Sequence, residues 1–128
     1  MTIALWCVLI GGLMPLAWTG VAKWSGDQKL GPEENKDPRA WLATLTGAQA
    51  RANAAQLNAI EAFPLFAAAV IISHILGADQ AMADKLAMAW VGLRLVYGVL
   101  YITDISAVRT LVWGASLAVT VWIFALAA

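Results

Sequence analysis

A chain of 128 residues is long enough for one domain, but 62% of its residues are hydrophobic and only 12% are charged. Soluble domains contain roughly 45–50% apolar and about 25% charged residues, so this composition excludes an ordinary soluble protein and indicates a membrane protein. The formal net charge is zero. No basic surface is therefore available to neutralise a nucleic-acid backbone, and we expect no nucleic-acid partner.

Four stretches are apolar enough to cross a bilayer as helices, which takes about 20 residues at about 1.5 Å per residue. The first carries no charge, the second has a polar first half, the third is interrupted by Arg94, and the fourth carries only Arg109 near its start. The predicted transmembrane helices cover residues 2–22, 48–76, 85–103 and 108–127. We expect them to form a single domain over residues 1–128.

Residues 23–47 form the one long loop and contain eight of the 16 charged side chains. Within this loop, Asp37-Pro38 is typical of a helix N-cap followed by a proline at the first helical position, which predicts a short helix through Trp41 and Leu42 at the membrane interface. The later connections are short. Consecutive helices should therefore be antiparallel neighbours in an all-α, up-down four-helix membrane bundle.

The distribution of lysine and arginine predicts the orientation, because both residues concentrate in cytoplasmic loops. The side with the first and third loops carries six of them, against Lys85 alone on the other side. These six residues are Lys23, Lys29, Lys36, Arg39, Arg51 and Arg109. We therefore expect the 23–47 loop in the cytoplasm and both chain termini on the opposite side, in a protein that contacts membrane lipids.

Two of the predicted helices carry polar side chains at membrane depth, where a charge costs about 2.5–3.5 kcal/mol on insertion scales and normally faces a partner inside the bundle. Glu61 is ten residues beyond Arg51, where the chain enters from the cytoplasm, and so lies roughly 15 Å in. Arg94 is nine residues before the exit near Thr103 and lies roughly 14 Å in, so we expect the two charges at one level. At about 100° per residue, the polar residues of each helix share one stripe. The stripes consist of Arg51, Asn58 and Glu61 on one helix and of Arg94, Tyr97 and Tyr101 on the other.

If the two stripes face each other, they form a polar cleft open to the cytoplasm, with Glu61 paired to Arg94 at its floor. For this pair alone, a structural pin between two helices is the alternative interpretation. For the stripes as a whole, the number of hydrogen-bond donors favours a binding site. Arginine and tyrosine donors suit an anionic ligand that bears carboxylates.

Other residues are assigned structural roles. Gly92 and Gly98 are expected to let helices approach closely, and Trp90 and Trp113 are interpreted as packing residues. His74 stands alone, without a second ligand at metal spacing. The single cysteine, Cys7, has no thiol partner, so we expect no metal site.

The segment from Arg51 to Phe66 contains the spacing Asn58, Glu61 and Pro64-x-Phe66. It resembles the second-helix signature of the membrane-associated proteins in eicosanoid and glutathione metabolism, the MAPEG family. The pattern formed by Arg94, Tyr97, Tyr101, Asp104 and Arg109 resembles a second signature of the family. The run from Asp37 to Leu42 resembles the corresponding segment of the family's small bacterial members. The resemblance extends over the four spans.

The resemblance implies a homotrimer of four-helix subunits, with glutathione bound as co-substrate between neighbouring subunits near the cytoplasmic face. For the small bacterial branch the membrane is the bacterial inner (plasma) membrane, so the orientation predicted from lysine and arginine places both termini in the periplasm. Characterised members conjugate glutathione to lipophilic electrophiles, reduce lipid hydroperoxides or isomerise a prostaglandin endoperoxide, and at least one relative only binds lipid. Arg109 lies close to the arginine that activates the thiol in some members. By motif match, the glutathione-contacting positions are Arg51, Asn58, Glu61, Arg94, Tyr97 and Tyr101.

The chain departs from the family's eicosanoid enzymes at two positions, with Ala54 in place of a second arginine and Ala62 in place of a tyrosine. Two hypotheses therefore stay open. The first is a glutathione-dependent transferase or peroxidase that acts on lipophilic electrophiles or lipid hydroperoxides. The second is a non-catalytic membrane protein, either a lipid-binding module or an accessory subunit of a larger membrane complex, which the missing arginine favours.

Overall fold

Four long helices contain most of the chain in the computed structural model, which describes residues 1–128. The long helices are α1 (Ile3–Trp24), α3 (Gly47–Ile75), α4 (Gln80–Ile102) and α5 (Ser106–Ala125), and the short ones are η1 (Glu34–Lys36) and α2 (Pro38–Ala43). Each long helix has the length and hydropathy of a membrane span. The predicted all-α, four-span architecture is therefore confirmed.

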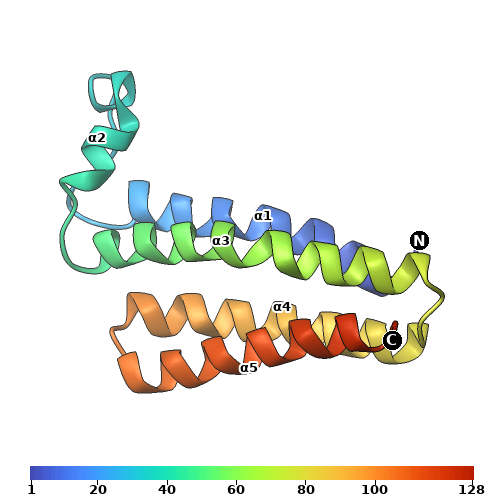
Figure 1. Ribbon diagram of the computed structural model, residues 1–128. Coiled ribbons are helices and arrows are strands. Elements are labelled where there is room, and N and C mark those ends of the chain that lie inside the picture. The colour runs from blue at the N-terminus through green and yellow to red at the C-terminus, as the bar shows by residue number, and fades with distance from the viewer.

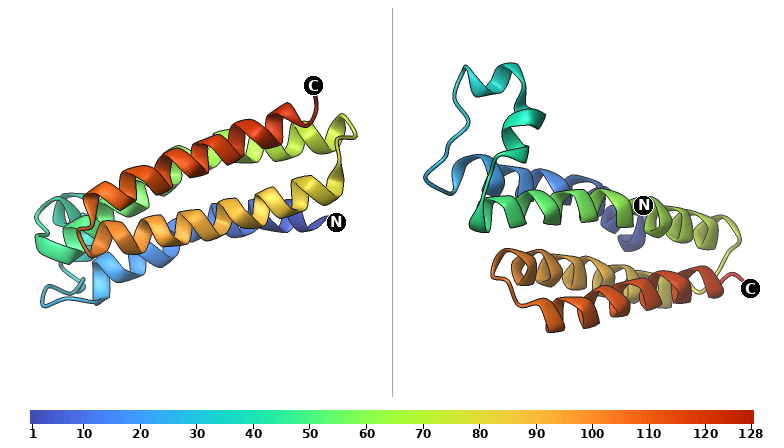
Figure 2. Two further views of the ribbon diagram at one scale, coloured as in Figure 1. Left: turned by 90° about the horizontal axis from the view of Figure 1, so that it is seen from below. Right: turned by 60° about the vertical axis from the view of Figure 1, so that its left-hand side comes forward.

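The long helices run up and down as an elongated bundle (Figure 1). Helix α1 packs most extensively against α3, and α4 packs most extensively against α5. Both termini lie at one end of the bundle, and α2 projects from the other (Figures 1 and 2). We call these the terminal end and the α2 end. Because α3 starts and α4 finishes at the α2 end, polar residues early in α3 and late in α4 lie at similar levels.

The short helix α2 begins as its sequence predicts. The side chain of Asp37 accepts a hydrogen bond from the backbone N–H of Ala40, with a nitrogen–oxygen distance of 3.2 Å, and Pro38 occupies the first turn. Trp41 and Leu42 pack partly buried against a small core at the α2 end. This contact attaches the polar loop to the bundle.

Helix α4 begins five residues before the predicted start at residue 85. The side chain of Asp79 caps it by accepting a hydrogen bond from the backbone N–H of Met82. Asp84, which directly precedes the predicted helix 85–103, lies inside α4 and accepts hydrogen bonds from the backbone N–H of Ala4 at 2.8 Å and from Nε2 of Gln80 at 2.7 Å. The early start of α4 therefore lets Asp84 bind one of the unpaired N–H groups at the beginning of α1.

The middle of the bundle contains a stacked aromatic pair. The rings of Phe66 on α3 and Trp90 on α4 lie 3.7 Å apart between centroids and 2° from parallel. Both side chains are buried among small residues of α1, α3 and α4. This pair fixes the level at which α3 meets α4, and the polar residues follow on its α2 side.

Of the two glycines expected to permit close helix packing, only Gly98 does so. A Cβ atom at Gly98 would overlap the ring of Trp18, whereas a Cβ atom at Gly92 would meet no heavy atom within 4 Å. Within the subunit, the expectation for Gly92 is wrong because that residue faces outward. Trp18 of α1 therefore packs directly on the α4 backbone at Gly98.

We expect the substitution Gly98→Ala to lower the free energy of unfolding by about 1–3 kcal/mol, because the buried Trp18 ring must move to admit the methyl group. The matched variant Gly92→Ala in the same helix should have no cost, and it should add up to about 1 kcal/mol of helix propensity. Thermal unfolding in detergent measures both. Equal effects of the two substitutions would contradict this packing.

Candidate functional site

Arg94 is the most buried large polar residue of the bundle, with 1% of its surface exposed. Its Nη2 donates a hydrogen bond to Oδ1 of Asn58 on α3 at 2.6 Å. The other two nitrogens of the guanidinium, Nε and Nη1, are buried and have no hydrogen-bond partner. Unpaired buried donors are costly, and a guanidinium matches a carboxylate in geometry and charge. Arg94 therefore has the unused capacity to bind an anionic group.

The predicted ion pair between Glu61 and Arg94 is wrong. The only ion pair of the structure joins Lys36 and Glu33 in the loop, and Glu61 is exposed. The guanidinium of Arg94 lies over the ring of Tyr97, 4.3 Å from its centroid. Tyr97 is one turn nearer the α2 end, so this contact directs Arg94 toward Asn58 and away from Glu61.

Aromatic and cationic side chains continue from Arg94 to the α2 end. The rings of Tyr97 and Tyr101 meet edge to face, with centroids 5.7 Å apart and planes at 74°. The guanidinium of Arg109, near the start of α5, lies 4.1 Å from the centroid of the Tyr101 ring. We call Asn58, Arg94, Tyr97, Tyr101 and Arg109 the polar row. The structure thus brings together five of the seven residues that the sequence assigns to the site.

Arg51 and Glu61 lie outside these contacts. Nε of Arg51 donates a hydrogen bond at 2.9 Å to the backbone carbonyl of Ile102, the last residue of α4. The final carbonyls of a helix have no partner within it and carry partial negative charge, so a cationic donor is favourable there. Arg51 therefore has a structural contact that the sequence does not reveal.

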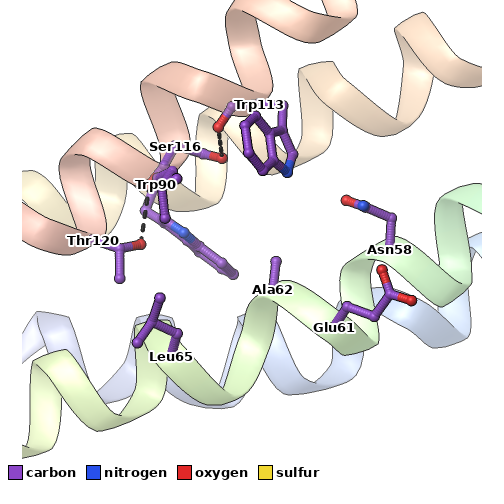
Figure 3. A pocket seen from close by; sticks show the side chains of 9 residues that line it. Asn58, Glu61, Ala62, Leu65, Trp90, Trp113, Ser116 and Thr120 are labelled. Carbon is purple, nitrogen blue, oxygen red and sulfur yellow. Dashed lines mark hydrogen bonds between the residues drawn. The ribbon is translucent and has the colours of Figure 1, made fainter.

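Next to the polar row, a pocket of about 300 Å³ opens between α3, α4 and α5 (Figure 3). The side chains of Asn58 and Glu61 lie together at one end, and Trp90 and Trp113 lie along the side contributed by α4 and α5 (Figure 3). The lining residues are Asn58, Glu61, Ala62, Leu65, Trp90, Trp113, Ser116, Leu117 and Thr120. A second, apolar pocket of about 240 Å³ continues along α3 and α5 and shares Leu65 and Thr120 with the first.

Residues along α5 line this pocket, which was not predicted from the sequence. Trp113, Ser116 and Thr120 are spaced as one helical face, and this periodicity was the available signal. The hydroxyl of Ser116 donates to the carbonyl of Trp113, and that of Thr120 donates to the carbonyl of Ser116. Trp113, interpreted above as packing, is 44% exposed and lines the pocket instead.

The two parts of the site differ in chemistry. The polar row presents two guanidinium groups, two phenol rings and an amide, which suit the carboxylates of a peptide-like ligand. The pocket presents tryptophan, leucine and alanine side chains with a single carboxylate. The two parts therefore offer donors for a polar anionic group and an apolar lining for a lipophilic group, with Asn58 common to both parts.

Comparison with family models gives one match, to a model described as the MAPEG family, over residues 3–128. This is nearly the entire chain and includes all four long helices. Searches of curated proteins and of solved structures gave no match.

Proposed function

Because the chain belongs to the MAPEG family, we propose that it is a membrane glutathione transferase or peroxidase that acts on lipophilic electrophiles or lipid hydroperoxides. The observation that carries this proposal is the buried guanidinium of Arg94, two of whose nitrogens have no partner. Such a group inside a membrane protein marks a binding site for an anion. Glutathione carries two carboxylates, and Arg94 binds one of them.

Glutathione also carries an ammonium group, which requires an acceptor. Glu61 provides an unpaired carboxylate one turn along α3 from Asn58. We assign the ammonium to Glu61, a carboxylate to Arg94, and further hydrogen bonds to Tyr97, Tyr101 and Arg51. The lipophilic co-substrate then occupies the pocket between Trp90 and Trp113.

Glutathione supplies a thiol, which becomes the nucleophile once it loses its proton. Free thiols have a pKa of about 8.5, and a nearby cation lowers that value. Of the two arginines in the polar row, Arg109 is the one nearer the α2 end. We assign it the role of donating a hydrogen bond to the sulfur and stabilising the thiolate.

The test of this proposal is the rate at which the purified protein conjugates glutathione to a chromogenic, lipophilic electrophile in detergent. The proposal requires a rate well above that of the same mixture without protein. The competing candidate is a non-catalytic lipid-binding module or accessory subunit. It is supported by Ala62, which lines the pocket without any polar group. Lipid binding without conjugation would favour that candidate.

A homotrimer forms part of this proposal. Asn53 and Gln56 lie on the face of α3 away from α4, where they line a separate crevice with Arg39, and Oε1 of Gln56 is buried without a partner. Polar side chains on membrane helices commonly bind a neighbouring helix, so we propose that another subunit covers this face. Native mass spectrometry from mild detergent should show three copies. A persistent monomer would contradict the trimer.

We further propose that the protein resides in a bacterial inner membrane with both termini in the periplasm. The support is the excess of lysine and arginine at the α2 end, since such residues concentrate on the cytoplasmic side. A reporter that is active only in the cytoplasm should be inactive when fused to Ala128. Strong reporter activity would reverse the orientation.

A further inference from the structure

The pocket beside the polar row has an unusual charge for a site next to two arginines. Glu61 is its only charged lining residue, and no lysine, arginine or histidine lines it. Glu61 also forms no ion pair. The guanidinium groups of the polar row have other contacts, because Arg94 is bonded to Asn58 and lies over the Tyr97 ring, and Arg109 lies over the Tyr101 ring. The polar end of the pocket is therefore anionic.

A carboxylate at membrane depth is costly and normally has a partner. Glu61 lies 14 residues from the start of α3 at Gly47, or roughly 21 Å along the helix. That depth is well within the span, where water and counter-ions are scarce. A positively charged ligand would supply the partner that the subunit itself does not.

The rest of the lining suits the apolar part of such a ligand. Trp90 and the half-exposed Trp113 present indole rings, and indole is the ring that attracts organic cations most strongly. Ser116 and Thr120 give their hydroxyl hydrogens to backbone carbonyls. These hydroxyl groups therefore offer the lining acceptors rather than donors, and acceptors favour positive charge.

We propose that this pocket binds lipophilic organic cations, namely ammonium ions that carry an aromatic or aliphatic group. The carboxylate of Glu61 balances the charge, and Trp113 contacts the cation through its ring. A volume of about 300 Å³ is at the small end of ligand pockets and suits a compact, one-ring molecule. This binding needs no thiol and goes beyond the proposed glutathione chemistry.

The shared use of Glu61 has a consequence for the proposed function. If the ammonium of glutathione also occupies Glu61, the lipophilic cation and glutathione should compete. Saturating cation would then raise the apparent Kd of glutathione. If no competition is observed, the cation-binding proposal is unaffected, but the assignment of Glu61 to the ammonium of glutathione is wrong.

The experiment measures binding of benzyltrimethylammonium to the purified protein in nonionic detergent by calorimetry. Neopentylbenzene is the matched neutral ligand, because it replaces the charged nitrogen by carbon and keeps the shape. We expect wild-type protein to bind the cation about tenfold or more tightly than the neutral compound, as for a cation that gains a carboxylate and a ring contact in a desolvated site.

Two variants and one control locate the site. Glu61→Gln should weaken cation binding about tenfold or more and leave the neutral compound unaffected. Trp113→Leu should weaken cation binding several-fold, whereas Trp122→Leu should not, since Trp122 is a similarly exposed tryptophan of α5 outside the pocket. Thermal unfolding shows that each variant is folded. Should Glu61→Gln fail to fold, the Trp113 and Trp122 pair still locates the site.

Equal affinity for the charged and neutral compounds would overturn the proposal, as would no binding of the cation at all. Unchanged cation binding in folded Glu61→Gln protein would overturn it as well. Cation binding that glutathione does not displace would support the pocket and count against the glutathione assignment of Glu61. The two proposals therefore fail separately.

Discussion

Replacing Arg94 by methionine is expected to weaken glutathione binding about 10- to 100-fold, because a hydrogen-bonded charge contributes about 1.5–3 kcal/mol. The same substitution should raise the stability of the glutathione-free protein by about 1–3 kcal/mol, since it removes a buried charge with two unpaired donors. The loss of the single bond to Asn58 offsets only part of this gain. Equilibrium binding of labelled glutathione and thermal unfolding measure the two effects.

Two controls give the Arg94 result its meaning. Lys29→Met removes an exposed cationic side chain of the 23–47 loop and should change neither quantity by more than a few tenths of a kcal/mol. Arg94→Lys keeps the charge but loses the planar pair of donors, so it should bind glutathione more weakly than wild type. Wild-type affinity in Arg94→Met would exclude Arg94 as the carboxylate-binding residue.

The four spans and the polar row follow from features within single helices. Apolar length predicts a span, and positions 94, 97 and 101 share a face of α4 because three and four residues are close to one turn. Arg109 belongs to the polar row because α5 starts at the α2 end. The position of Arg109 near the start of that helix is evident from the sequence. These properties do not depend on how one helix rotates against another.

The partner of Arg94 depends on that rotation. Asn58 and Glu61 lie within one turn of α3, and depth arithmetic along two helices does not distinguish them. The choice follows from the direction of the Arg94 side chain over Tyr97, which the sequence does not encode locally. For the same reason Gly92 and Gly98 look alike in the sequence, although only Gly98 faces Trp18.

The pocket lining also depends on helix rotation, which the sequence does not predict. Helix α5 is apolar on most sides, and the spacing of Trp113, Ser116 and Thr120 is its only sequence signal for an inward face. Trp113, Ser116 and Thr120 are spaced along one face, but Leu117 beside them also lines the pocket, while Trp122 remains outside it. Only the packing of α5 against α3 and α4 reveals that this face borders Glu61.

Arg109→Ala should reduce the turnover number for glutathione conjugation by about 10²- to 10³-fold, the usual cost of removing a group that stabilises developing or reactive negative charge. Glutathione affinity should change little, because the carboxylates lie at the Arg94 end of the polar row. Steady-state kinetics with a chromogenic electrophile separate the two effects.

Variants around Arg109 refine this assignment. Arg109→Lys should retain part of the activity because it keeps the positive charge. Tyr101→Phe preserves the ring on which Arg109 packs, so the turnover number should change little, whereas glutathione affinity should fall by the loss of one hydrogen bond. A large rise in the Kd of glutathione for Arg109→Ala, with an unchanged turnover number, would instead place Arg109 at a carboxylate.

Calorimetry of the wild-type protein with glutathione in detergent tests the central claim most directly, because it requires neither a known electrophile nor a catalytic turnover. The proposed site predicts saturable binding of glutathione, with much weaker binding by folded Arg94→Met protein. The absence of saturable binding by folded wild-type protein would contradict a glutathione site at Arg94.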